Sequence, residues 1–434
     1  MRIIHLICIA LLGLWAAGCD LLSLEVENPN NVLEEDLENP AAAAAIANGA
    51  EATVTRALGA ILAPYSTASD ELKWVGSRDS WRDLDYGKVD DIYNEFTDNA
   101  FTYVAEARWT ADKAIERLEG FASQGVLRDP IQLARAYAYA AIIYITIADM
   151  FDDFAFSDRT QPAPNIGRDK IPELYDKAVD YCTKGIEIAQ AVNNTLWEKR
   201  LLALRARARY SKALRAKIRP NQVDTANPLV NDAEANQDAQ AALAKMGTED
   251  FVFRLETSPA TPDLIVGDMS MALQVNFRLE MRIGDDYIVP TADDKKVASV
   301  KLLDPIDNRV DPKLEREITE FTIAERYAPM TVVSRREMHL ILAEAALARN
   351  DIAEFQNQIN AIRSLDGLSS YTGQIPARDM LIHTRRVNLF LQGRRLADHY
   401  RFQQYPREWI AGYYKPGAFF PITISERRAN PLVR

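Results

Sequence analysis

Cysteine is scarce in this sequence and lies mostly at one end of it. Cys8 and Cys19 fall within and at the end of an apolar N-terminal segment, which leaves Cys182 alone in the rest of the 434-residue chain. A single remaining thiol excludes an intramolecular disulfide framework. Cys182 lies in a predicted helix, where we expect it to be a small buried hydrophobe.

Catalytic and metal-binding signatures are missing as well. The three histidines that follow the N-terminal segment, His339, His383 and His399, lie in predicted helices without zinc-ligand spacing. The sequence has no glycine-rich phosphate loop and no nucleophile elbow. Its 62 acidic residues place carboxylates near one another by chance, so the opposed pair that a glycosidase needs cannot be inferred from spacing. We expect no enzyme activity and no cofactor.

Positive charge is in deficit. The chain has 51 Lys and Arg residues against 62 Asp and Glu residues, which gives a formal net charge of -11. Phosphate backbones are bound by concentrated basic surfaces. The composition therefore excludes nucleic acid as an expected partner.

The N-terminal segment has the pattern of a secretory signal. Arg2 precedes an apolar run over residues 3–17, and Ala16-Ala17-Gly18-Cys19 resembles a bacterial lipobox with alanine in place of its usual leucine. We expect residues 1–18 to be a lipoprotein signal peptide, Cys19 to be lipidated, and residues 19–36 to form a lipidated tether to a bilayer. The alternative is an ordinary cleaved signal with a chance cysteine.

Helical periodicity dominates most of the remaining chain, residues 37–434, which we expect to form a single domain. Apolar positions at a period of 3.6 residues predict helices over 40–61, 133–150, 196–218 and 231–245, another opened by Pro172, and a hairpin over 334–363. Helical hairpins of roughly 34 residues are typical of tetratricopeptide-like units. The fold class is therefore mainly α, with tetratricopeptide-like hairpins.

One helix is predicted over residues 385–402. Its apolar stripe includes Leu389 and Leu396, and Gly393 at the edge of the stripe indicates close approach of another backbone. Arg394 and Asp398 have the i, i+4 spacing of a favourable ion pair. Arg386, Arg394 and Arg401 lie on a different face, where we expect structural pairing with carboxylates.

An aromatic-rich stretch over residues 64–110 interrupts the helices, and no period holds between residues 65 and 87. Irregular loops of this kind commonly carry binding residues. Aromatic faces can stack on sugar rings while charged groups bind their hydroxyls. The predicted ligand-binding residues are Trp81, Trp74, Tyr86, Arg78, Asp79 and Asp83. The alternative is that these aromatic rings pack the loop onto the helices.

Two further segments are candidates for function. Asp149, Asp152, Asp153 and Asp158 supply four carboxylates in ten residues, a set that could hold a structural calcium ion or form an ordinary acidic loop. Residues 247–333 are the least periodic region, which we expect to be an irregular insertion packed over one face. Within it, residues 285–287 are candidates for the ligand surface.

The C-terminal third carries three motifs in a fixed order: a helical hairpin, an arginine-rich helix and an apolar tail. Together they resemble the SusD/RagB family of outer-membrane nutrient-binding lipoproteins. The matching residues are Leu342-Ala343-Glu344-Ala345 through Ile362-Arg363, then Arg385-Arg386 through Gly393-Arg394-Arg395, Asp398 and Arg401, then Phe420-Pro421-Ile422 through Glu426, Asn430 and Pro431. The departures are Asn388 and Gln392 in place of glutamates, and Thr423 in place of a proline.

The resemblance implies a SusD-like fold with a loop-rich ligand face. It also implies a lipid-anchored protein on the outer membrane, facing the cell exterior. Such a protein captures an oligosaccharide, or in some members a peptide, and hands it to a SusC-like TonB-dependent transporter without catalysis. The alternative is a tetratricopeptide-type scaffold lipoprotein that binds only proteins in an outer-membrane assembly complex.

Overall fold

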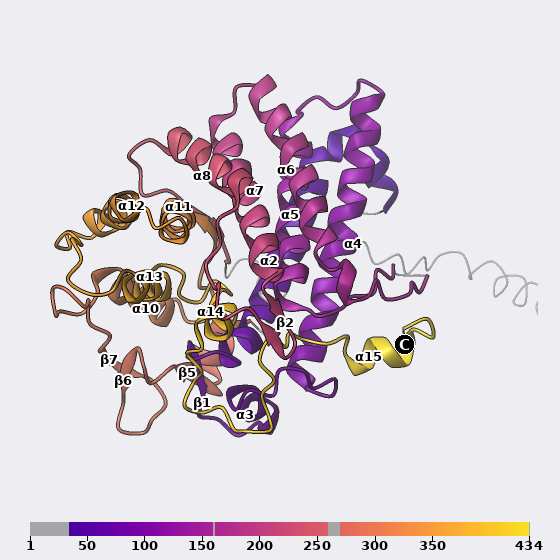
Figure 1. The fold of residues 1–434 in the computed structure, drawn as a ribbon. Coiled ribbons are helices and arrows are strands. Elements are labelled where there is room, and N and C mark those ends of the chain that lie inside the picture. Colours follow the sequence, from indigo (N-terminus) through magenta and orange to yellow (C-terminus); the bar gives the residue numbers. More distant parts are fainter. Residues whose placement is uncertain (1–33, 159–160, 259–269, 434) are drawn as a thin grey trace, which may run out of the picture.

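The computed structural model describes residues 34–158, 161–258 and 270–433. Cys19 and the predicted signal peptide lie outside these residues. Most of the described chain is helical (Figure 1). The helices are α2 (Ala43–Thr67), α3 (Asp79–Asp85), α4 (Glu95–Ser123), α5 (Ile131–Met150), α6 (Glu173–Ala191), α7 (Thr195–Arg215), α8 (Ala233–Met246), α10 (Pro312–Ile323), α11 (Arg335–Ala348), α12 (Ile352–Leu365), α13 (Ala377–Asn388), α14 (Arg395–Phe402) and α15 (Ile424–Ala429).

Helices that follow one another in the chain pack side by side. The packed pairs are α2 with α4, α5 with α6, α6 with α7, α7 with α8, and α11 with α12. Small alanines on α5 and α7 face larger residues and permit this close packing. The prediction of a mainly α fold built from helical hairpins is confirmed.

The helix α5 is the one part of the described chain that is long and apolar enough to cross a membrane, yet 83% of its apolar window is buried inside the protein. It packs against α2, α4, α6 and α7. Cys182 of α6 is also fully buried, and burial raises the pKa of its thiol. The expectation that Cys182 is a small buried hydrophobe is confirmed.

Strands are short and form two-stranded antiparallel pairs. The pairs are β1 (Leu72–Trp74) with β5 (Met281–Ile283), β2 (Ile218–Arg219) with β3 (Gln222–Val223), β4 (Val252–Leu255) with β8 (Met330–Ser334), and β6 (Ile288–Pro290) with β7 (Val297–Val300). Apart from α10, the regular elements in the described part of the predicted insertion over 247–333 are the strands β4 to β8 and a π-helical turn, Leu273–Phe277.

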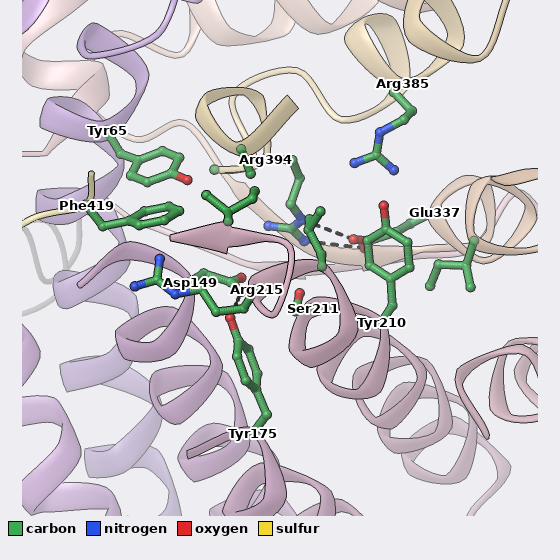
Figure 2. A pocket seen from close by; sticks show the side chains of 15 residues that line it. Tyr65, Asp149, Tyr175, Tyr210, Ser211, Arg215, Glu337, Arg385, Arg394 and Phe419 are labelled. Atoms are coloured by element: carbon green, nitrogen blue, oxygen red, sulfur yellow. Dashed lines mark hydrogen bonds and ion pairs between the residues drawn. The ribbon is translucent and has the colours of Figure 1, made fainter. Parts of the chain in front are cut away.

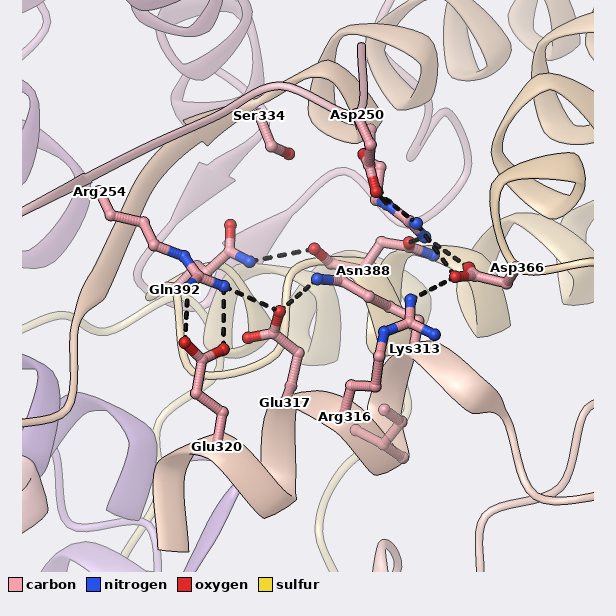
Figure 3. A network of polar contacts seen from close by, with 12 residues as sticks. Asp250, Arg254, Lys313, Arg316, Glu317, Glu320, Ser334, Asp366, Asn388 and Gln392 are labelled. Carbon is pink, nitrogen blue, oxygen red and sulfur yellow. Dashed lines mark hydrogen bonds and ion pairs between the residues drawn. The ribbon is translucent and has the colours of Figure 1, made fainter. Parts of the chain in front are cut away.

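Ion pairs hold the insertion against the C-terminal helices (Figure 3). Arg336 of α11 is 1% exposed and pairs with Asp250 before β4 at 2.7 Å and with Asp366 after α12 at 2.5 Å. Within the insertion, Arg254 of β4 pairs with Glu320 of α10 at 2.7 Å. A buried arginine between two carboxylates is costly to leave unpaired, so the network fixes the position of the insertion.

The predicted single helix over 385–402 is wrong. The chain forms two helices, α13 and α14, joined by a turn in which Leu391 (φ 56°) and Gly393 (φ 73°) adopt the left-handed conformation. Residues in this conformation cannot continue a right-handed helix, so the chain changes direction before α14 begins. A Cβ on residue 393 would lie 2.5 Å from the Cε atom of Met150, so Gly393 does allow a close approach, here by a side chain.

The arginines of α13 and α14 are paired as expected, but with other partners than sequence spacing indicated. Arg394 pairs with Glu337 at 3.0 Å and not with Asp398. Asp398 instead pairs with Arg385 at 2.9 Å and with Arg401 at 2.8 Å. Because the turn reorients α14 relative to α13, the i, i+4 spacing across their junction does not bring side chains together.

Candidate functional site

The site is a polar cavity of about 270 Å³. It lies where α3, β1 and β5 meet the loop over residues 403–418, at the lower edge of the view in Figure 1. Its lining comes from three distant parts of the chain: Asp70, Leu72, Lys73 and Asp85; then Gly284, Asp285 and Asp286; then Arg386, Arg395, His399, Gln404, Tyr405, Pro406, Arg407 and Glu408.

Strand pairing brings the first two parts together. Leu72 of β1 lies opposite Ile283 of β5, and the backbone N–H of Gly284 donates to the carbonyl of Glu71 at 2.9 Å. A Cβ on residue 284 would lie 1.9 Å from the carbonyl oxygen of Asp70. This crossing therefore needs glycine, and it sets Asp285 beside Lys73.

A buried charge cluster forms the floor of the cavity. Arg395 binds both carboxylate oxygens of Asp70 at 2.8 Å, His399 Nε2 lies 3.2 Å from one of them, and the Tyr287 hydroxyl donates to the same oxygen at 3.1 Å. Burial alone would raise the pKa of Asp70, but Arg395 and His399 hold it well below its usual value. Burial and the Arg395 charge lower the pKa of His399.

One wall of the cavity is rich in carboxylates. Lys73 Nζ pairs with Asp285 and lies 3.5 Å from Glu408. Burial would raise the pKa of Asp285, but Lys73 and Arg282 lower it. Asp85, at the end of α3, is only 4% exposed, and burial together with the Glu408 charge raises its pKa to about 8.

Arginines also line the cavity. The Arg386 guanidinium lies over the Tyr287 ring at 4.3 Å, and its Nη2 is 3.4 Å from Asp286. Arg407 also approaches Asp286, at 3.6 Å, from a side chain that is 88% exposed. Charged groups of both signs therefore face the same cavity.

The loop over residues 403–418 adds aromatic rings. Tyr405 lines the cavity and stacks on Trp409 with ring centroids 5.6 Å apart, and Tyr414 lies 5.0 Å from Trp409. This cluster sits on Gly87, whose φ is 90° and where a Cβ would lie 2.8 Å from Tyr414. The carbonyl of Tyr86 accepts from the backbone N–H of residue 410 at 3.1 Å, which fastens the loop to the end of α3.

The structure corrects the role predicted for Trp81. Residues 79–85 form the helix α3 and not an irregular loop, and Trp81 is 0% exposed, stacked on Phe96 with ring centroids 3.7 Å apart. Because both ring faces are buried, this tryptophan cannot stack on a sugar. It packs α3 onto α4, which was the alternative interpretation.

The other five predicted residues lie within α3 or next to it and do not line the cavity. Arg78 is exposed and pairs with Glu95 at 3.5 Å. Asp79 is also exposed and pairs with Arg82 at 2.9 Å. Asp83 lies 3.4 Å from Lys88. Half-buried Trp74 lies under the Arg82 guanidinium, and half-buried Tyr86 anchors the 403–418 loop through its carbonyl.

Two of the three residues named as candidates for the ligand surface, Asp285 and Asp286, line the cavity, whereas Tyr287 is buried. Lys73, Asp85, Arg386, Arg395, Tyr405 and Glu408 were missed. A signal existed for one of them: Trp81, Leu84 and Asp85 have the i, i+3, i+4 spacing of a buried helical face, and a carboxylate on such a face is unusual.

The four aspartates over residues 149–158 face protein donors. Asp149 pairs with Arg207 at 2.8 Å, and Asp152 pairs with Arg215 at 3.0 Å. Asp153 accepts from Asn165 and from the backbone N–H of residue 167, at 2.6 and 2.8 Å. These carboxylates therefore have counter-charges or hydrogen-bond donors within the protein.

A second acidic group, Asp304, Asp311 and His383, brings metal-ligating atoms within 4.8 Å of one another. Both carboxylates already have partners. Asp304 binds Arg363 at 2.6 and 3.0 Å, and Asp311 caps α10 by accepting from the backbone N–H of Lys313 at 2.9 Å. We interpret the group as a structural junction between α10 and α13.

An interior cavity lies between α5, α7 and α14, lined by Tyr65, Tyr175, Arg215 and Arg394 among others (Figure 2). Its volume is about 30 Å³. This is the space of one or two water molecules. It cannot accept a sugar ring, so the larger cavity beside α3 is the candidate ligand site.

Comparison with known proteins identifies the fold. No family model and no curated protein matches the chain. A SusD superfamily protein from Bacteroides thetaiotaomicron matches with a TM-score of 0.63 and 13% identity, over 91% of this chain and 99% of that one. A SusD superfamily protein from Bacteroides fragilis matches with a TM-score of 0.61 and 11% identity, over 91% of this chain and 99% of that one. A SusD-like carbohydrate binding protein from Bacteroides vulgatus matches with a TM-score of 0.50 and 14% identity, over 84% of each chain.

Proposed function

We propose that this chain, which has the SusD fold, is a SusD-type binding lipoprotein that captures an oligosaccharide in the cavity beside α3. The cavity itself is the observation that carries the proposal. It joins charged and polar groups, which bind sugar hydroxyls, to the half-buried ring of Tyr405, which offers a face for a sugar ring. The name of the Bacteroides vulgatus protein, a carbohydrate binder, supports the same ligand class.

The captured sugar is then handed to a SusC-like TonB-dependent transporter. In this proposal Cys19 carries the lipid that holds the protein on the outer membrane, facing the cell exterior. The helical hairpins α4–α8 meet the transporter, and the loop-rich end with the cavity faces the ligand. Binding and hand-off require no covalent chemistry, so no catalytic residue is assigned.

Isolation of the protein from native outer membranes tests this role. After gentle solubilisation and capture, we expect a TonB-dependent barrel at about equal stoichiometry. A Cys19→Ser variant, which lacks the lipidation site, should be absent from the outer-membrane fraction and serves as the control. Recovery of barrel-assembly or envelope-scaffold proteins in place of a transporter would contradict the proposal and favour the scaffold alternative.

A further inference from the structure

Asp85 is an unusual lining residue. Its side chain is almost fully buried at the cavity wall, at 4% exposure. Among the residues that the structure describes it has no ion pair, and the backbone N–H of Trp74 is the donor that faces its carboxyl group. A buried carboxylate without a counter-charge is costly, so this position is poised for a group that the ligand brings.

The charged groups around Asp85 are predominantly acidic. Glu408 of the 403–418 loop and Asp285 after β5 face it, against the single ammonium of Lys73 on β1. Arg282 pairs with Asp285 at 2.7 Å, but it also pairs with Asp294 at 2.6 Å, so its charge is divided between two carboxylates. This end of the cavity therefore has more carboxylates than cations once Asp85 is ionised.

We infer that this end of the cavity recognises a primary ammonium group of the ligand, which makes an unacetylated amino sugar the preferred unit of the bound oligosaccharide. The inference rests on the proposed function and narrows its substrate class. An ammonium has three N–H donors and no acceptor, which suits a site made of carboxylate oxygens. The ring of Tyr405 in the same cavity favours a sugar over a peptide as the carrier of that group.

In the empty cavity the missing counter-charge is supplied by a proton. Burial, and after it the Glu408 charge, raises the pKa of Asp85 to about 8, so the group is mostly neutral at pH 7. A bound ammonium favours the ionised form and displaces this proton. Below the pKa of Asp85, affinity for the ammonium must therefore fall as the pH falls, by up to about tenfold per pH unit.

The test compares matched probes by calorimetric titration. The probes are a β-1,4-linked glucosamine trisaccharide, its fully N-acetylated counterpart, and the tripeptide Ala-Ala-Ala with a free amino terminus. At about pH 7 we expect the glucosamine probe to bind at least about tenfold more tightly than the acetylated one. Its affinity should fall between about pH 7 and about pH 5.5, while that of the acetylated probe should not.

Asp85→Asn is the decisive variant. It keeps the shape and the neutral state of the residue in the empty cavity, so we expect an unchanged thermal midpoint, together with loss of the preference for the glucosamine probe. Asp112→Asn is the matched control, because Asp112 of α4 also has a pKa raised by burial but contacts Tyr144 and Arg108 away from the cavity. This control should keep the preference.

Several results would overturn the inference. They are equal or tighter binding of the acetylated probe, a preference that survives in Asp85→Asn, tighter binding of the tripeptide, or no binding of the glucosamine probe up to about 10 mM. Binding of the acetylated probe alone would leave the proposed function standing. Failure of the proposed function would appear separately, as recovery from the membrane without a transporter.

Discussion

Trp81 shows how burial decides the role of a single residue. Its indole lies nearly parallel to the Phe96 ring, at 10° and 3.7 Å between centroids, and joins α3 to α4. Buried aromatic residues contribute large apolar areas, and stacked pairs add to that contribution. Trp81 therefore stabilises α3 against α4. It affects the position of Asp85 only because Asp85 belongs to the same helix.

Trp81→Ala should lower the free energy of unfolding by about 3–5 kcal/mol, because it leaves a large cavity between α3 and α4. Denaturant unfolding monitored by circular dichroism measures this change. Tyr93→Ala, at a side chain that is 65% exposed, is the control and should change stability by less than about 0.5 kcal/mol. A Trp81→Ala protein of unchanged stability would contradict the packing role.

Residue types alone could not assign this site. Tryptophan and aspartate in an aromatic-rich stretch fit either a sugar surface or a packed helix, and the two interpretations differ only in which face is buried. The i, i+3, i+4 spacing of Trp81, Leu84 and Asp85 would have favoured the helix. Lys73 and Glu408, 335 positions apart, meet only because β1 and the 403–418 loop share a cavity wall.

At the scale of elements, the turn between α13 and α14 has the largest structural consequence. Glu71 stabilises it by accepting from the backbone N–H of Leu391 at 2.7 Å. Burial raises the pKa of Glu71 to about 7. The turn places Arg386 on one side and Arg395 and His399 on the other, so that both helices line the cavity.

Gly393→Ala should destabilise the protein by roughly 1–3 kcal/mol. The positive φ disfavours any residue with a Cβ, and the added methyl would displace the Met150 side chain. Gly120→Ala is the matched control, because Gly120 lies inside α4 with no atom near its Cβ position. We expect that control to raise the thermal midpoint, and a Gly393→Ala protein that is equally stabilised would contradict the account of the turn.

Periodicity predicted the hairpin helices well because each presents apolar residues at helical spacing over its whole length, and α5 is buried on nearly every side. It failed at residues 385–402 because two short helices in succession carried apolar positions seven residues apart across their junction. Ser334 caps α11 by accepting from the backbone N–H of Glu337 at 3.2 Å, a local contact between near neighbours in the sequence. Glu337 itself pairs with Arg394, a contact that depends on the turn.

At the scale of the whole molecule, the helical hairpins form a large apolar core and α11–α13 a second, smaller one. The strands β1, β5, β6 and β7 and the 403–418 loop gather at one end of this framework (Figure 1). That arrangement brings together a cavity lining from three parts of the chain. We infer that the framework carries the binding face and that specificity resides in the residues of the cavity.

The most direct test of the account is the affinity of an oligosaccharide, identified on a glycan array, for the wild-type protein and for Tyr405→Ala. We expect the variant to bind about tenfold more weakly, because the ring that lines the cavity is lost. Tyr413→Ala, at a residue of the same loop that is 44% exposed and does not line the cavity, should bind like the wild type. Equal affinities for wild type and Tyr405→Ala, or an array without any bound oligosaccharide, would contradict the central claim.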